Sequence, residues 1–125
     1  MGRILLVEDD VELLRALGVL LRLRGHQIEV AGNGREGLEI LKSTNLPYDL
    51  IVSDVRMPEM DGVTMARELD RQQVAVGTPI LFISAWITER DLPSLRFHPV
   101  QFVQKSQRFD QIMKAIVHLV QKKSA

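Results

Sequence analysis

The sequence predicts an α/β fold, a doubly wound sheet of five parallel strands in the order 2-1-3-4-5 with helices on both faces. Continuous apolar runs at 4–7, 50–52 and 80–83 indicate central strands that are buried on both faces. Runs at 27–31 and 100–103 alternate polar and apolar residues and indicate edge strands. Amphipathic stretches between the strands supply the helical crossovers that a parallel sheet requires.

Each expected helix has an apolar stripe at the spacing of one helical face. We assign Asp10 to the start of the first helix, and Gly25 suits its C-terminal end. A Gly-Asn-Gly turn precedes the second helix, with Asn33 as a suitable N-cap. The third follows the turn at Asp61-Gly62, and lysines near the end of the last suit the helix dipole. The expected helices cover residues 11–24, 34–42, 63–71 and 109–120.

The segment from Trp86 to Pro99 is the least regular part of the pattern. A crossover helix is expected between the fourth and fifth strands, but Pro93 and Pro99 both limit helix formation, so about one or two turns fit before Pro93. We therefore predict that this fourth helix is short or irregular.

Composition excludes several classes of function. The 125 residues suit a single domain over 1–125. The 16 basic residues balance 16 acidic ones, so the chain has no net positive charge that would attract nucleic acid or an anionic membrane. The absence of cysteine excludes disulfides, thiolate metal sites and thiol nucleophiles, and the three scattered histidines are expected to be structural or exposed. No apolar run reaches the ~18 residues of a membrane span, and the start of the chain does not resemble a signal peptide. We expect a cytoplasmic location.

Polar side chains lie at the ends of four of the five expected strands. Glu8 and Asp9 follow the first strand, Asp54 ends the third, Ser84 ends the fourth, and Lys105 follows the fifth. The carboxyl ends of parallel strands meet at one edge of the sheet, and ligands bind there, near the switch point between strands one and three. The fold therefore gathers three carboxylates, a hydroxyl and an ammonium group into one pocket.

This set of groups suits phosphoryl chemistry. Three carboxylates that lie close together either have raised pKa values or bind a cation. Oxygen ligands without histidine or cysteine select a hard ion, Mg²⁺ or Mn²⁺. An arriving phosphoryl group would also meet Lys105, the Ser84 hydroxyl and backbone N–H groups. Asp54, the acid nearest the centre, can then act as a nucleophile and become an acyl phosphate.

The motifs LLVED, DLIVSDVRMPEMDG, PILFISA and FVQK, taken in this order, resemble the receiver domain of response regulators in two-component signal transduction, from Ile4 to about Val120. Receivers have a flavodoxin-like (CheY-like) fold. The resemblance implies that Asp54 accepts a phosphoryl group, in an Mg²⁺-dependent reaction, from a sensor histidine kinase or a histidine phosphotransfer protein. It implies a switch that assists its own phosphorylation and dephosphorylation, rather than an enzyme. Its further partners would be a downstream effector or output domain, and a homodimer is also allowed.

The resemblance also implies which residues hold the metal ion. Glu8 and Asp9 would bind Mg²⁺ together with Asp54, and the backbone carbonyl of Arg56 would complete the protein ligands. The phosphoacceptor would become a 4-aspartylphosphate.

Further residues would read the phosphorylated state. Ser84 and Lys105 would contact the phosphoryl oxygens, together with the backbone N–H of Ala85. Phe102 matches the aromatic switch position, which turns inward when the hydroxyl residue moves toward the phosphate.

Two departures from the family pattern leave a second interpretation open. Ser106 follows Lys105 where receivers usually have proline, and the segment 86–99 is irregular. The alternative is a pseudo-receiver, a constitutive protein-interaction module that is not phosphorylated. Retention of all five site residues favours the phosphoacceptor. An FMN site or a phosphatase on the same fold is disfavoured, because the loop after the first strand is acidic and Arg56 replaces a second aspartate.

Overall fold

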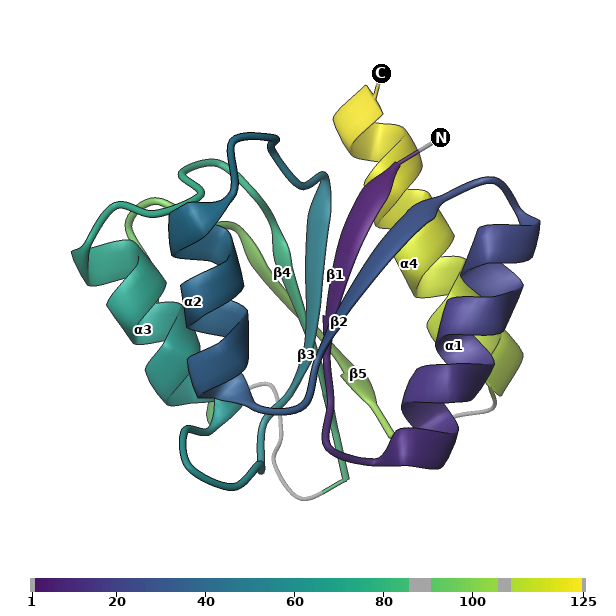
Figure 1. Cartoon of the computed structure of the whole chain (residues 1–125), viewed down its shortest axis with the longest axis horizontal. Coiled ribbons are helices and arrows are strands. Elements are labelled where there is room, and N and C mark those ends of the chain that lie inside the picture. Colours follow the sequence, from purple (N-terminus) through teal and green to yellow (C-terminus); the bar gives the residue numbers. More distant parts are fainter. Residues whose placement is uncertain (1, 86–90, 106–108, 125) are drawn as a thin grey trace.

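Figure 1 shows a computed structural model of the chain, which describes residues 2–85, 91–105 and 109–124. Five parallel strands form one sheet in the predicted order β2-β1-β3-β4-β5. The strands are β1 (Arg3–Val7), β2 (Gln27–Ala31), β3 (Leu50–Asp54), β4 (Ile80–Ser84) and β5 (Val100–Gln104). The helices are α1 (Val11–Leu23), α2 (Gly34–Ser43), α3 (Gly62–Arg71) and α4 (Phe109–Ser124).

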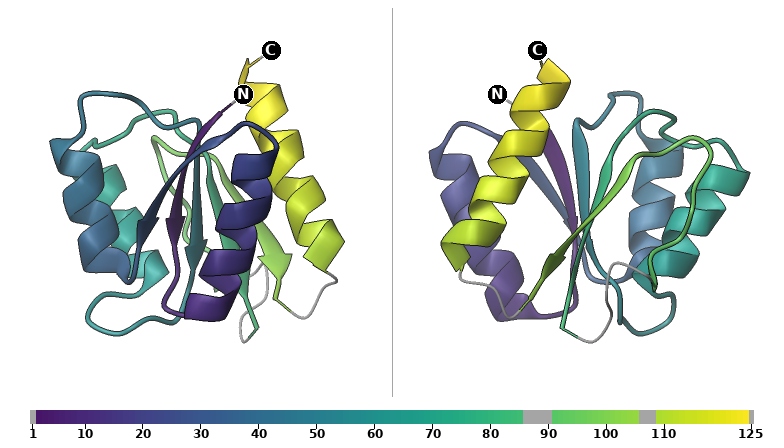
Figure 2. Two further views of the ribbon diagram at one scale, coloured as in Figure 1. Left: turned by 45° about the vertical axis from the view of Figure 1, so that its right-hand side comes forward. Right: turned by 180° about the vertical axis from the view of Figure 1, so that it is seen from behind.

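The helices cover the sheet in two layers. Helices α1 and α4 pack on one face and α2 and α3 on the other, as both views in Figure 2 also show. Alternate residues of β1 therefore enter different cores: Ile4 and Leu6 pack with α1 and α4, whereas Leu5 and Val7 pack with α2 and α3. Among the described residues, no helix combines the length and apolar character needed to cross a membrane.

Burial separates the central strands from the edge strands as predicted. Every residue of β3 and β4 is buried, because parallel strands inside such a sheet are covered by helices on both faces. The two outer strands, β2 and β5, keep several exposed residues. The last residue of β3, Asp54, is buried as well, so a carboxylate lies at the end of a core strand.

Side chains cap three of the helices. The carboxylate of Asp10 accepts the N–H groups at the start of α1, and Asn33 accepts the N–H of Glu36 in α2. Both caps were predicted from the sequence. Asp61, assigned from the sequence only to a turn, caps α3 by accepting the N–H of Thr64 at 2.7 Å.

The connection between β4 and β5 differs from the other crossovers. Residues 92–99 contain no helix, and Leu92 and Leu95 pack against the core between the sheet and α2 and α3. The segment ends where the carbonyl of Pro99 accepts the N–H of Ile80 at 2.8 Å. This part agrees with the prediction of a short or irregular fourth helix, while residues 86–90 lie outside the described residues.

Candidate functional site

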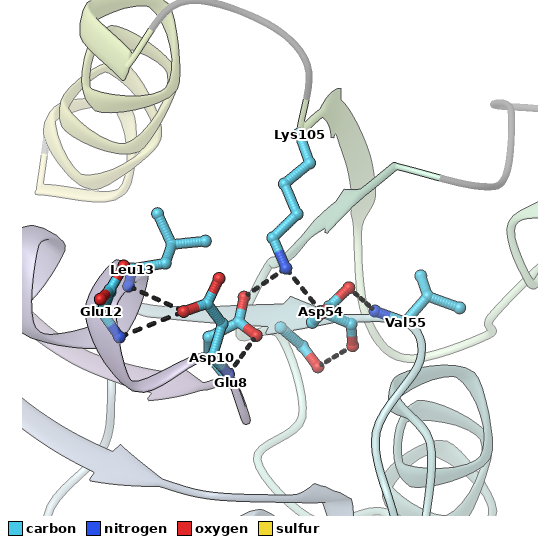
Figure 3. Close-up of polar contacts among 8 residues, drawn as sticks. Glu8, Asp10, Glu12, Leu13, Asp54, Val55 and Lys105 are labelled. Carbon is cyan, nitrogen blue, oxygen red and sulfur yellow. Dashed lines mark hydrogen bonds and ion pairs between the residues drawn. The ribbon is translucent and has the colours of Figure 1, made fainter.

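The predicted site residues meet at the carboxyl edge of the sheet. Glu8 and Asp9 follow β1, Asp54 ends β3 and Lys105 follows β5; Figure 3 shows Glu8, Asp54 and Lys105 pointing toward one another. One carboxylate oxygen from each of the three acids lies within 4.8 Å of the other two. Glu8 and Asp54 are only 5% and 7% exposed, whereas Asp9 is exposed to solvent. The site thus has a buried floor and an open side.

Lys105 bridges the two buried acids. Its Nζ lies 3.0 Å from Asp54 Oδ2 and 3.2 Å from Glu8 Oε1. Its backbone N–H donates to the carbonyl of Ser84 at 2.9 Å, and this bond fixes the start of the side chain. Burial alone would lower the pKa of Lys105, but the two carboxylates outweigh it and raise that pKa. Lys105 therefore stays charged.

One ammonium group does not balance three carboxylates. Burial raises the pKa of Glu8 to about 7, and the negative charge of Asp54 adds to this shift. The N–H of Asp10, which donates to Glu8 Oε2 at 2.9 Å, and the charge of Lys105 oppose it without cancelling it. Among the described contacts of these acids, negative charge exceeds positive charge and the possible metal ligands are carboxylate oxygens, so the site fits a hard divalent cation such as Mg²⁺ or Mn²⁺.

The carboxylate of Asp54 is held in one orientation. Its Oδ1 accepts the N–H of Val55 at 2.7 Å, and its Oδ2 accepts from Lys105. The buried hydroxyl of Ser53 donates to the carbonyl of Asp54 at 2.7 Å, and the N–H of Gly62 donates to Val55 O at 2.8 Å. The sequence predicts that Gly62 helps to shape the turn after Asp54, but it predicts no role for Ser53, because a serine in an apolar strand has ordinary structural explanations.

Gly62 allows the loop after β3 to fold back onto the end of that strand. A Cβ atom at this position would contact the carbonyl of Asp54 and lie 2.7 Å from the hydroxyl oxygen of Ser53. We expect Gly62→Ala to lower the free energy of unfolding by about 1–3 kcal/mol, and to slow phosphorylation of Asp54 because the carboxylate is displaced.

Urea unfolding and the rate of acetyl phosphate incorporation would measure these effects. Gly18→Ala on α1 is the matched control, since its Cβ would meet only the flexible guanidinium of Arg22 at 3.4 Å. In a helix interior this change should stabilise the chain by roughly 0.5–1 kcal/mol. Equal effects of the two substitutions would contradict a role for Gly62 at the site.

The other predicted residues lie at or near the same edge of the sheet. Ser84 is fully buried at the end of β4, and Ala85 is exposed directly after it. Arg56 is exposed in the loop that follows Asp54. Phe102 is partly buried, opposite Phe82 in the β4–β5 pairing, and packs with the core on the α2 and α3 side. The junction between Lys105 and Ser106 lies outside the described residues.

Comparison with known proteins agrees with this geometry. The family model of the response regulator receiver domain matches residues 4–117. The transcriptional regulatory protein GlrR of Escherichia coli strain K12 is 40% identical over 84 residues, which is 67% of this chain and 18% of that protein. The transcriptional regulatory protein ZraR of the same strain is 32% identical over 120 residues, 92% of this chain and 26% of that protein. The chain thus spans about a quarter or less of each relative's length.

A solved structure extends the comparison to three dimensions. The crystal structure of the response regulator protein TrrA from Thermotoga maritima, in complex with Mg²⁺ and BeF, superposes with a TM-score of 0.76 at 30% sequence identity. It covers 95% of this chain and 99% of that one. The family match over most of the length, together with the shared fold, identifies the chain: it belongs to the response regulator receiver domain family.

Proposed function

We propose that the chain accepts a phosphoryl group on Asp54 from a sensor histidine kinase or a histidine phosphotransfer protein, and then changes the surface that it presents to a downstream effector or output domain. The observation that supports this most is the buried carboxylate of Asp54, which shares the ammonium group of Lys105 with Glu8 and lies close to a third acid, Asp9. Such a set of charges serves binding chemistry rather than stability. We also propose that this reaction takes place in the cytoplasm.

In the proposed reaction Asp54 is the nucleophile. One carboxylate oxygen bonds to phosphorus as the phosphorus–nitrogen bond of the donor phosphohistidine breaks, and the donor imidazole leaves. The N–H of Val55 and the ammonium of Lys105 hold the carboxylate for this attack. Lys105, the Ser84 hydroxyl and the N–H of Ala85 then contact the phosphoryl oxygens at the ends of β4 and β5. The chain is a phosphoacceptor switch rather than an enzyme that acts on other molecules.

The acids beside Asp54 are the proposed metal ligands. Glu8, Asp9 and Asp54, with the backbone carbonyl of Arg56, would hold Mg²⁺ or Mn²⁺, which neutralises charge between the nucleophile and the phosphoryl oxygens. Glu8 has to be ionised to act as a ligand, and its pKa is raised to about 7. The protein's own charge pattern therefore makes metal binding stronger as the pH rises through neutrality.

Switching is a population shift between two surfaces. Phosphorylation favours the arrangement in which Ser84 and Lys105 close on the phosphate. Phe102 lies on the edge strand β5, which Lys105 follows, and its side chain is only partly buried in this structure. Its inward rotation would change the exposed face of β5, which is the proposed signal to the effector.

The proposed phosphodonor would dock on α1. Several large hydrophobic side chains are exposed in the described part of the chain. Four of them lie on α1: Val11, Val19, Leu20 and Leu23. Val19 and Leu20 line a shallow apolar depression, and α1 begins directly after the acids of the site. An amphipathic helix of the donor would cover this stripe and bring its phosphohistidine to Asp54.

We expect Val19→Asp to slow transfer from a histidine phosphotransfer protein at least tenfold, since a buried charge opposes the apolar contact. Phosphorylation by acetyl phosphate should stay unchanged, because a small donor needs no docking. Val76→Asp is the matched control, an exposed valine in the turn between α3 and β4. Any phosphotransfer protein that phosphorylates the unmodified chain can be used. Equal loss with both donors, or in both variants, would remove α1 as the docking face.

Beryllofluoride, a phosphoryl analogue, tests the site without a donor. With Mg²⁺ it should bind the wild-type chain and shift the backbone amide signals of the loops after β3 and β4. Asp54→Asn should give no shift, because the analogue bonds to the carboxylate oxygen. A wild-type chain that fails to bind beryllofluoride would favour the pseudo-receiver, a constitutive interaction module with the same fold.

A further inference from the structure

A second network of charged groups fastens the end of the β4–β5 connection to α3. Asp70, near the end of α3, accepts the backbone N–H of Arg96 at 2.9 Å and that of Phe97 at 2.8 Å. The same carboxylate lies 2.9 Å from Nδ1 of His98. One side chain of α3 therefore holds three consecutive residues of the connection.

His98 is enclosed by acceptors on both sides. The residue is 4% exposed, with Nδ1 against Asp70 Oδ1 and Nε2 2.8 Å from the carbonyl oxygen of Val74. A neutral imidazole has one N–H and one bare nitrogen, so either neutral tautomer would turn a lone pair toward an oxygen. Only the imidazolium, with two N–H groups, donates to both partners.

Asp70 supplies the matching negative charge. Its removal from water raises the pKa of Asp70, but the hydrogen bonds from the Arg96 N–H, from His98 and from the Phe97 N–H outweigh this and lower it. The carboxylate thus stays ionised across neutral pH and cannot donate a proton to His98. A buried imidazolium is tolerated here because it is paired and hydrogen-bonded.

Few other titratable groups lie on the described elements around His98. The turn 72–79 and the strand β5 contain no acidic, basic or histidine residue. On α3, Glu68 and Arg71 pair with each other at 2.6 Å near the surface, and the remaining charged residues of these elements are Arg67, Asp91 and Arg96. Among the described contacts of His98, Asp70 is the charged partner.

We infer that His98 is held as an imidazolium whose proton latches the segment Leu92–Pro99 onto α3, so that loss of this proton releases the segment. The latch weakens as the pH rises, because a neutral ring has to give up one of its two contacts. It weakens again in strong acid, once Asp70 is protonated below its lowered pKa.

This device goes beyond phosphorylation and does not depend on it. The latched segment lies between Ser84 at the end of β4 and Phe102 on β5, two residues of the proposed switch. Its release would alter the surface next to β5 in the unphosphorylated chain. The pH would thereby act on the partner-facing side of the domain independently of Asp54.

Nuclear magnetic resonance of the histidine ring nitrogens tests the inference on the unmodified chain. In the latched state, both ring nitrogens of His98 should carry a proton, because both face oxygen acceptors. As the pH rises and His98 loses one proton, the exchange protection of the Arg96 and Phe97 amides should fall roughly tenfold after correction for intrinsic exchange. A neutral His98 tautomer, seen while these amides remain protected, would overturn the inference.

Asp70→Asn is the diagnostic variant. An asparagine amide can donate to a bare Nδ1 while Nε2–H donates to Val74 O, so the pair needs no extra proton. The amide NH2 then replaces Asp70 Oδ1, which also accepts the Phe97 N–H, so Phe97 should be less protected than in wild type. The protection of the Arg96 and Phe97 amides should, however, no longer change from neutral to alkaline pH. His118→Gln, which removes an exposed histidine, should behave as wild type.

If Asp70→Asn keeps the wild-type pH dependence, the proton on His98 is not the latch. Because Asp54 is intact in all these proteins and phosphorylation is not used, failure here leaves the phosphoacceptor proposal untouched.

Discussion

Replacing Glu8 with glutamine is expected to stabilise the metal-free chain and to weaken its binding of Mg²⁺. Burial beside Asp54 raises the pKa of Glu8 from 4.5 to about 7. Ionisation of this group therefore lowers the free energy of unfolding. A shift of this size corresponds to at most ~3 kcal/mol at alkaline pH. Glutamine removes the charge and can still accept the N–H of Asp10, although it loses the contact with Lys105.

The sign of the effect depends on pH. A carboxyl group whose pKa is higher in the folded state favours folding below its unfolded value, and this contribution is lost as the pH rises through about 7. The gain from Glu8→Gln should therefore be absent near pH 4 and full near pH 8. Mg²⁺ affinity near pH 8 should fall about tenfold or more, since one charged ligand is lost.

Urea unfolding with and without EDTA at both pH values measures the first effect, and titration calorimetry measures the second. Glu12→Gln, an exposed acid on α1, is the control and should change neither quantity appreciably. A Glu8→Gln chain that is less stable than wild type near pH 8 without metal, or that binds Mg²⁺ equally well, would contradict the electrostatic account of the site.

Replacing Lys105 with methionine is expected to have the opposite effect on the metal-free chain. Glu8 and Asp54 would lose the one ammonium that contacts both. Removing one partner of a fully buried pair costs about 3–5 kcal/mol, and because Lys105 is 23% exposed we expect ~1–2 kcal/mol here. The pKa of Glu8 should then rise further, because Lys105 no longer lowers it. Beryllofluoride binding should weaken at least tenfold, since the ammonium group that would donate to its fluorine atoms is gone.

Thermal unfolding and beryllofluoride titration, each with and without Mg²⁺, would measure these changes. The stabilisation by Mg²⁺ should be larger in Lys105→Met than in wild type, because the cation then supplies the missing positive charge. Lys114→Met, an exposed lysine on α4, is the matched control. Unchanged beryllofluoride affinity would show that Lys105 does not contact the phosphoryl position.

The fold was predictable because its determinants are local. Central strands need continuous apolar runs and edge strands tolerate alternation, so the patterns at 4–7 and 27–31 already placed β1 and β2 in the sheet. The meeting of Glu8, Asp9, Asp54 and Lys105 then follows from topology, since parallel strands end at one edge.

Other contacts left no local signal. Pro93 and Pro99 predicted an irregular connection, but nothing in the pattern pairs His98 with Asp70, 28 residues earlier and on another element. An aspartate near the end of a helix and a histidine beside a proline both have the appearance of surface residues. Their pairing depends on how the connection folds back over α3, which is decided by tertiary packing rather than by periodicity.

Intact-mass spectrometry after incubation with acetyl phosphate tests most directly whether Asp54 is the phosphoacceptor. With Mg²⁺, the wild-type chain should gain the mass of one phosphoryl group. Asp54→Asn should gain none, and neither should the wild type in EDTA. A phosphoryl adduct that persists in Asp54→Asn, or a wild-type chain that gains no mass with Mg²⁺ and also fails to bind beryllofluoride, would contradict the account.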